Sequence, residues 1–217
     1  MTPSFWSNVQ VAIQSALSTA VTIDAISKAN PGLIEYTDAG ASDPANGAYV
    51  LLSVNGMHQL DQRVVRVANV DTASDDFEAE GVDTTSFDTF SSGTFQVITF
   101  GTTLSSAVGI NASGGDYETA DITTIHDSTR KVVPTVASPL TYTFDCLWDP
   151  SDTALAALKA ASDAKSTRAV KFTFSDGRIF VFNGYVGASL APTGGAQEAV
   201  RTSVTITAYG RPTAYSS

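Results

Sequence analysis

Residues 140–211 carry the clearest pattern of apolar and polar positions in the chain. The segment from Thr141 to Leu147 alternates between the two kinds of side chain, which predicts a β-strand with one buried face. Residues 169–185 predict a hairpin, because two more alternating segments flank Asp176-Gly177, a dipeptide that favours tight turns between strands. The pattern then predicts a closing strand over residues 200–209.

A helix is predicted between the first strand and the hairpin, over about residues 150–163. Asp149 is a good N-cap residue, and Pro150 suits the first helical position because no partner there needs its missing N–H. Leu155 and Leu158 follow at helical spacing, so one face of this helix should pack against the strands. The C-terminal half therefore predicts a mainly β architecture with one flanking α-helix.

The N-terminal residues 5–20 fit two patterns. Phe5, Val9 and Ile13 lie four residues apart, which favours a helix, whereas Val9, Val11 and Ile13 alternate with polar residues, which favours a strand. Phe5 and Trp6 also place two large aromatic side chains near the start of the chain. We expect them either to pack on the chain's own strands or to contact a neighbouring subunit.

Residues 21–95 contain short alternating segments separated by turn residues such as Asn30-Pro31-Gly32 and Asn55-Gly56. Short strands at this spacing are typical of a small β-barrel. The predicted strands of this module are Thr22–Ile26, Tyr49–Val54, Arg63–Val70 and Phe77–Glu80. Another strand is predicted at Gln96–Phe100, where we expect the pattern of the C-terminal half to resume.

Charge divides the chain into two unequal parts. Residues 1–100 hold 12 of the 22 acidic side chains and 3 of the 12 basic ones, whereas residues 101–217 hold 10 and 9. Neither part has the basic stripe that a DNA-binding protein needs to displace counterions from phosphate. The sequence also lacks a run of 18 apolar residues and an N-terminal signal peptide, so neither a membrane partner nor export is expected.

Candidate catalytic and metal-binding residues are few. His126-Asp127 could be drawn as part of a catalytic triad, but neighbours in sequence are not thereby partners in space. The acidic residues Asp75, Asp76, Glu78 and Glu80 do not match the spacing of a calcium-binding loop and are better explained as a solvated face. Cys146, the only cysteine, lies in a strand pattern and is expected to be a small buried residue. We therefore expect no enzyme activity and no cofactor.

Several segments over residues 96–212 resemble, in the same order, the tail tube proteins of bacteriophages with long, non-contractile tails. They are Gly114-Gly115-Asp116-Tyr117-Glu118, Thr123-Thr124-Ile125-His126-Asp127, Asp149-Pro150-Ser151-Asp152, Phe174-Ser175-Asp176-Gly177, Asn183-Gly184-Tyr185-Val186 and Ala208-Tyr209-Gly210-Arg211-Pro212. The resemblance implies a β-barrel or sandwich whose N-terminal segment is a strand, which decides between the two patterns of residues 5–20.

The module also has a resemblance of its own. Residues 48–94 are similar to small β-barrel modules of phage particle proteins and to the first catalytic-cysteine half-domain of ubiquitin-activating enzymes. Only a scaffold is implied, without ubiquitin chemistry. We therefore expect a discontinuous tail tube domain, residues 1–20 and 96–217, that carries residues 21–95 as an inserted barrel module. We also expect the tube domain to fold without this module.

Residues 117–139 form a long, polar and β-branched segment between predicted strands. Pro134 and Pro139 should limit regular strand pairing there, so we expect a loop. In the family that the chain resembles, the corresponding loop reaches the next ring of the tube. The residues expected to form this ring-stacking contact are Ile122, Ile125, His126, Arg130, Lys131, Val132 and Val133.

The resemblance implies a structural virion protein that is assembled in the host cytoplasm. Homohexameric rings would stack into a tube, contact other tail proteins such as the tape measure and terminator proteins, and let DNA pass without specific binding. One alternative is the inner tube of a contractile tail or of a secretion system with the same fold. Another is a module that binds carbohydrate or a host surface.

Overall fold

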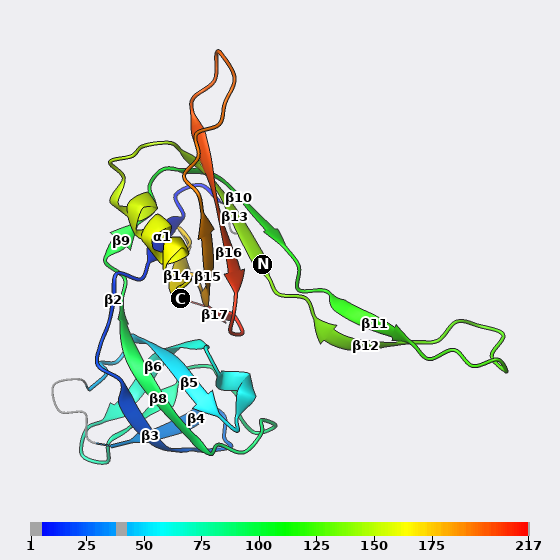
Figure 1. The fold of residues 1–217 in the computed structure, drawn as a ribbon. Coiled ribbons are helices and arrows are strands. Elements are labelled where there is room, and N and C mark those ends of the chain that lie inside the picture. The colour runs from blue at the N-terminus through cyan, green and yellow to red at the C-terminus, as the bar shows by residue number, and fades with distance from the viewer. Residues whose placement is uncertain (1–5, 38–42, 217) are drawn as a thin grey trace.

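The computed structural model describes residues 6–37 and 43–216, and within them the chain forms two β bodies and one α-helix. Figure 1 shows one body below the other, with a long hairpin that extends away from both. This arrangement confirms the predicted mainly β architecture with a flanking helix. Phe5 lies outside the described residues, so its expected packing is not addressed by the structure.

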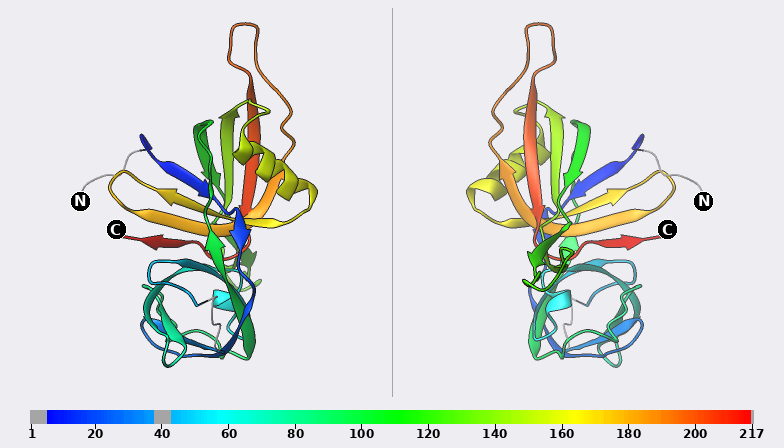
Figure 2. Two further views of the ribbon diagram at one scale, coloured as in Figure 1. Left: turned by 90° about the vertical axis from the view of Figure 1, so that its left-hand side faces the viewer. Right: turned by 90° about the vertical axis from the view of Figure 1, so that its right-hand side faces the viewer.

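The lower body in Figure 1 is a small barrel. Its strands in the described chain are β2 (Ala16–Leu17), β3 (Val21–Ile26), β4 (Gly32–Tyr36), β5 (Tyr49–Asn55), β6 (Val64–Asp71), β7 (Asp76–Ala79) and β8 (Ser92–Thr99). The order β8-β3-β4-β7-β6-β5 closes because β5 pairs again with β8, and Figure 2 shows the resulting round cross-section. Apolar side chains such as Ile34, Leu52, Phe77 and Phe95 fill the interior. A short 3-10 helix, His58–Leu60, follows β5.

The upper body is a curved sheet with eight strands in the described chain, here called the tube sheet. Its strands are β1 (Gln10–Ile13), β9 (Thr102–Thr103), β10 (Ala107–Ser113), β13 (Thr141–Leu147), β14 (Thr167–Thr173), β15 (Ile179–Ala188), β16 (Arg201–Ala208) and β17 (Thr213–Tyr215). Seven of them lie in the order β10-β13-β16-β15-β14-β1-β9, and β17 pairs with β15. The strand alternative is therefore right for residues 10–13, and the hairpin around Asp176-Gly177 is confirmed.

Helix α1 (Thr153–Asp163) begins later than predicted. Its N-cap is Asp152, whose carboxylate accepts hydrogen bonds from the amides of Ala154 at 2.8 Å and Leu155 at 3.4 Å. Asp149 was the wrong choice, because its carboxylate accepts from the amide and hydroxyl of Ser151 in a turn before the helix. The apolar face of α1 packs on one face of the tube sheet, where buried residues such as Phe144, Phe172 and Val204 form the main core.

The two bodies share a third apolar cluster. Tyr49, Leu51, Val64 and Ile98 of the barrel pack against Ala169, Val181 and Tyr215 of the tube sheet. Barrel pairing also extends beyond residues 21–95 on both sides, since β2 pairs with β8 at Leu17 and Ile98, and β8 pairs with β5 as far as Ile98. The strand at Gln96 thus joins the barrel rather than the tube sheet, because alternation marks a strand but not the sheet to which it belongs.

The segment of residues 117–139 contains two paired strands, where we expected an unpaired loop. Strands β11 (Tyr117–Asp121) and β12 (Val132–Ala137) form an antiparallel sheet of their own in the described chain. Pro134 lies within β12 opposite Thr119, beside a register shift that follows Tyr117. A proline is tolerated there because a two-stranded sheet consists only of edge strands, whose outer N–H groups need no partner in a ladder.

Candidate assembly surfaces

Residues 115–138, here called the arm, project from the tube sheet. The arm continues β10 and β13, and its base is fixed by hydrogen bonds that join Gly115 to Ser138 and Ser138 to Asp116, at 3.1 and 2.9 Å. Figure 1 shows that the arm extends well beyond both bodies. Its two strands therefore bury little against the rest of the chain, and every residue of β11 and β12 is exposed.

The arm exposes an unusual amount of apolar side chain. The exposed fraction is 97% for Ile125 at the tip, 70% for Val136 and 66% for Tyr117. Val132 and Val133 are exposed by 48% and 42%, and as consecutive strand residues they point to opposite faces of the arm. A single two-stranded hairpin is at best marginally stable in water, and this arm exposes apolar side chains on both of its faces.

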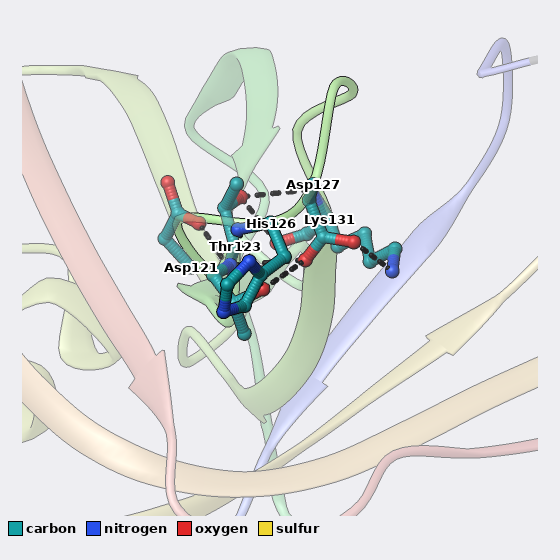
Figure 3. Close-up of polar contacts among 6 residues, drawn as sticks. Asp121, Thr123, His126, Asp127 and Lys131 are labelled. Atoms are coloured by element: carbon teal, nitrogen blue, oxygen red, sulfur yellow. Dashed lines mark hydrogen bonds and ion pairs between the residues drawn. The ribbon is translucent and has the colours of Figure 1, made fainter.

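The charged residues of the arm pair with one another at its tip. The Arg130 guanidinium contacts the Asp121 carboxylate at 3.0 Å, and the Lys131 ammonium pairs with Asp127. Asp121 also accepts from the amide of Thr123 at 2.9 Å. Figure 3 shows Asp121, Thr123, Asp127 and Lys131 close together around the turn of the arm. Hydrogen bonds from Thr123 and Arg130 lower the pKa of Asp121, and bonds from Lys131 and Thr124 lower the pKa of Asp127.

The structure thus brings all the predicted stacking residues into one arm. Ile122, Ile125, Val132 and Val133 are exposed, as are Arg130, Lys131 and His126. Sequence reasoning missed the internal partners of the two basic residues, Asp121 and Asp127. The spacing of four residues between Asp127 and Lys131 was visible in the sequence, but the pairing of Arg130 with Asp121 depends on the hairpin register.

A second surface is the face of β10, β13 and β16 that lies opposite the main core, here called the open face. Phe144 and Cys146 of β13 point into the core, so the residues between them point the other way. The register pairs Thr143 with Thr205 and Thr141 with Thr207 on that side. The open face comprises Asn111, Ser113, Thr141, Thr143, Asp145, Leu147, Arg201, Ser203, Thr205 and Thr207, all exposed or half-buried. It is rich in hydroxyl groups and carries one acidic and one basic side chain.

The described residues offer little material for catalysis or metal binding. They contain no group of three or more His, Cys, Asp or Glu side chains placed to hold a metal ion. Cys146 is buried, as predicted, and burial raises the pKa of its thiol to about 11, so little thiolate forms at neutral pH. His126 lies exposed at the arm tip, where its amide approaches the Thr124 hydroxyl at 3.4 Å. Across the described segments, the helix is too short and too polar to span a bilayer.

The described residues thus present a projecting arm with exposed apolar side chains and a polar open face. The sequence model of the family described as "Phage tail tube protein, TTP" matches residues 55–217, which is three quarters of the chain. The chain belongs to the phage tail tube protein family. A search of curated proteins returned no match.

Family membership makes this chain a structural component of the virion tail and a subunit of a multimeric assembly with other tail proteins. It thereby confirms the resemblance that rested on residues 96–212. The match begins at the end of β5, so it includes part of the small barrel as well as the whole arm. The likeness of the barrel to a ubiquitin-activating half-domain stays a prediction. A structural family points to a role other than catalysis.

Proposed function

We propose that this tail tube protein forms hexameric rings that stack into a tube, and that the lumen of the tube conducts DNA during ejection. The arm of each subunit, through Ile122, Ile125, His126 and residues 130–133, makes the contact between successive rings. Six copies per ring is what the resemblance to the family implies. The tape measure and terminator proteins would be further partners, and DNA would pass without specific binding.

The isolation of the arm carries this proposal. Two strands that pair only with each other, and that expose Val132 and Val133 on opposite faces, gain stability when other chains cover both faces. The arm joins a surface of one copy to a different surface of another, which makes the contact heterologous. Heterologous contacts close into rings or continue into filaments. In a stacked tube, contacts within a ring close and contacts between rings continue along the tube.

The open face suits the wall of a DNA conduit. A basic wall would bind phosphates by releasing counterions and would hold the DNA, whereas a wall of hydroxyl groups gives no such attraction. Asp145 and Arg201 bring opposite charges to the open face, so its formal charge is zero. We therefore assign the open face to the lumen.

We further propose that the barrel of residues 21–95, extended by its paired residues at Leu17 and Ile98, is an insertion in the tube domain. The remainder of residues 1–20 and 96–217 would form that domain, and the barrel would lie outside the lumen. Most of the chain's net negative charge falls in residues 1–100. A surface of this charge keeps assembled tubes apart in solution without repelling DNA inside the tube. A structure of the assembled tube with Asp76 and Glu78 on the lumen wall would contradict this placement.

Negative-stain electron microscopy of the purified full-length protein tests the proposal. The informative variant replaces residues 116–137 by an Asn-Gly turn, which preserves β10 and β13 but removes the arm. We expect stacked tubes from the natural chain, and single rings or monomers from the variant. A matched control shortens the other projecting loop, residues 191–199, and should leave stacking intact. If both purified proteins stay monomeric, the same comparison is made by adding them to tail initiator complexes.

Tubes of normal length from the armless variant would contradict the stacking role. A sheath around tubes isolated from particles would instead favour the inner tube of a contractile tail, the alternative with the same fold. The carbohydrate-binding alternative gains little support from the barrel, because Tyr36, Tyr49 and Phe77 are buried. Phe87 and Phe90 are half-buried and pack against the barrel core.

A further inference from the structure

An aromatic groove, distinct from the arm and from the open face, opens beside Trp6. It has a volume of about 250 Å³ and a mostly apolar lining that includes Trp6, Phe172, Phe174, Ile179 and Phe180. The Trp6 ring contacts Phe172 edge-on, with ring centroids 6.0 Å apart, and lies 5.5 Å from Phe174. Trp6 nevertheless remains 56% exposed. Its packing on the chain's own sheet therefore covers only part of the ring.

Exposed aromatic side chains in an apolar groove are typical anchors of protein interfaces. The described chain also exposes a matching convex feature, because Ile125 at the arm tip is 97% exposed. Engineered apolar cavities of about 150 Å³ bind a benzene molecule, so the larger groove can hold an isoleucine side chain. The groove thus has room for the Ile125 side chain, and both are apolar.

We propose that the arm tip of one subunit inserts Ile125 into the Trp6 groove of another copy of this chain. The inference rests on the proposed stacking role of the arm and names the surface that receives it. Charge does not oppose this pairing, since the acidic and basic side chains at the arm tip pair with one another and Arg178 lies at the rim of the groove. Arg178 also pairs with Asp176 of its own turn at 3.5 Å, which holds the rim in place.

Cys146, the only cysteine in the chain, is buried, so introduced cysteines can be cross-linked without interference from a native thiol. Reporter cysteines are placed beside the contact, as His126→Cys at the tip and Arg178→Cys at the rim, so that Ile125 and Trp6 are retained. The two variants are mixed, assembled into tubes or recovered in tails from particles, and treated with a short bismaleimide. We expect mixed dimers on denaturing gels from assembled tubes and none from monomers. Native Cys146 should not react, because it is buried.

A second set of variants tests the side chains themselves. In the same reporter background, Ile125→Ser and Trp6→Ala should each raise the concentration needed for assembly about tenfold or more. Each removes an apolar side chain that the contact would bury, and the lost burial weakens association by about that factor. The matched control is Val200→Ser, which removes another exposed aliphatic side chain and should change nothing. Circular dichroism checks that all three monomers remain folded.

These experiments distinguish a failure of the groove as receptor from a failure of the stacking role of the arm. Tubes in which the tip reporter links to a Val200→Cys reporter, but not to the rim of the groove, would overturn the groove as receptor and leave the stacking role intact. The same holds if Trp6→Ala lowers monomer stability without changing assembly, because the groove would then serve its own chain. Tubes that form normally from the armless variant would overturn the stacking role itself.

Discussion

The guanidinium carbon of Arg66 in the barrel lies 4.6 Å from the ring centroid of Tyr215 in the last strand of the tube sheet. The main-chain amide of Arg66 donates to the Tyr215 hydroxyl at 2.7 Å, and its side chain pairs with Glu80. Arg66 of the barrel thus contacts both the ring face and the hydroxyl group of Tyr215 in the tube sheet. Tyr215 also belongs to the shared cluster with Val181, so this contact helps to fix the barrel to the tube sheet.

Removal of the Tyr215 ring should therefore destabilise both bodies together. Tyr215→Ala opens a cavity in the shared cluster and should cost about 3 to 5 kcal/mol of the free energy of unfolding. Tyr215→Phe keeps the ring and removes the hydrogen bond to Arg66, so the expected loss is about 1 to 2 kcal/mol. Urea denaturation followed by tryptophan fluorescence and by circular dichroism measures both. Unchanged midpoints in Tyr215→Ala would show that the junction does not stabilise the fold.

The shared cluster should also determine whether the barrel module, residues 21–95, can be removed. From the sequence, residues 21–95 looked removable, but their removal would expose Ala169, Val181 and the Tyr215 ring to water. We therefore expect a chain that lacks the module to aggregate unless these positions are also made polar. Comparison of the simple deletion with a deletion that carries Val181→Thr, by expression and size-exclusion chromatography, tests this expectation. A soluble, folded simple deletion would contradict it.

Alkaline conditions should destabilise the junction between the barrel and the tube sheet. Burial raises the pKa of Tyr215 to about 12, from an ordinary value near 10. The neutral form is the one favoured in the fold, so its full stabilisation is present below pH 10 and is lost as the pH rises through 12. The size of the effect is about 2 to 3 kcal/mol. Tyr215→Phe should remove this step.

Tryptophan fluorescence follows that step selectively, because Trp6 and Trp148 both lie outside the barrel. Tyr36→Phe, in the interior of the barrel, is the control and should leave the fluorescence change in place. An identical alkaline transition in the natural chain and in Tyr215→Phe would show that another group is responsible.

Two adjacent glycines at the base of the arm offer a matched pair. Gly114 and Gly115 both have φ near +85°, so an alanine at either position carries the same backbone strain. Only at position 114 would the added Cβ meet main chain, 2.2 Å from the carbonyl oxygen of Pro139. Gly114→Ala should therefore cost about 1 to 3 kcal/mol more than Gly115→Ala.

Hydrogen exchange at the base of the arm gives the readout. Protection of the Ser138 amide, which donates to Asp116, should be lost in Gly114→Ala and largely retained in Gly115→Ala. We also expect the first variant to stack poorly, since the arm would leave the sheet at a different angle. Equal protection in the two variants would mean that the backbone accommodates the extra methyl group.

Much of this fold could be read from the sequence, and the failures have identifiable physical causes. Alternation located most strands of both bodies, and the Asp-Gly turn located the hairpin. The helix start was placed three residues early because two aspartates, Asp149 and Asp152, both satisfy the rule for an N-cap. Only the packing of Leu155 and Leu158 against the sheet selects the second.

The assembly surfaces were harder to predict than the strands. Pro134 argued against pairing, but the rule against proline applies to strands with partners on both sides, and β12 has one. The open face consists mostly of Thr and Ser residues, which are common in this sequence. Only the register of β13 with β16 shows that they lie on the same face of the sheet. The Trp6 groove brings together residues far apart in the sequence, so no local pattern could reveal it.

Arg130 should contribute to the proposed stacking contact by ordering the tip of the arm. Arg130 pairs with Asp121, so Arg130→Asp should loosen the tip by leaving two acidic groups together. The exchange Asp121→Arg with Arg130→Asp restores the pair and should restore both tip order and stacking. Nuclear magnetic resonance of the Ile122 amide follows the order of the tip in all of these variants, because this amide donates to the Lys131 carbonyl oxygen at 3.0 Å. A double variant with a well-ordered tip that still fails to stack would place the charges at the ring contact instead.

The open face should control the passage of DNA without controlling assembly. Thr143 and Thr205 are direct neighbours across β13 and β16, so lysines at both positions would place two positive charges per subunit on the lumen wall. Each lysine that neutralises a phosphate releases a counterion, so DNA should be retained most strongly at low salt. We expect particles with normal tails and slowed, salt-sensitive ejection, measured by the release of dye-stained DNA. The control places glutamine at the same two positions, which adds a long polar side chain without charge. Particles with this control should eject DNA at the natural rate. Ejection at the natural rate from the lysine variant at low salt would show that this face does not line the conduit.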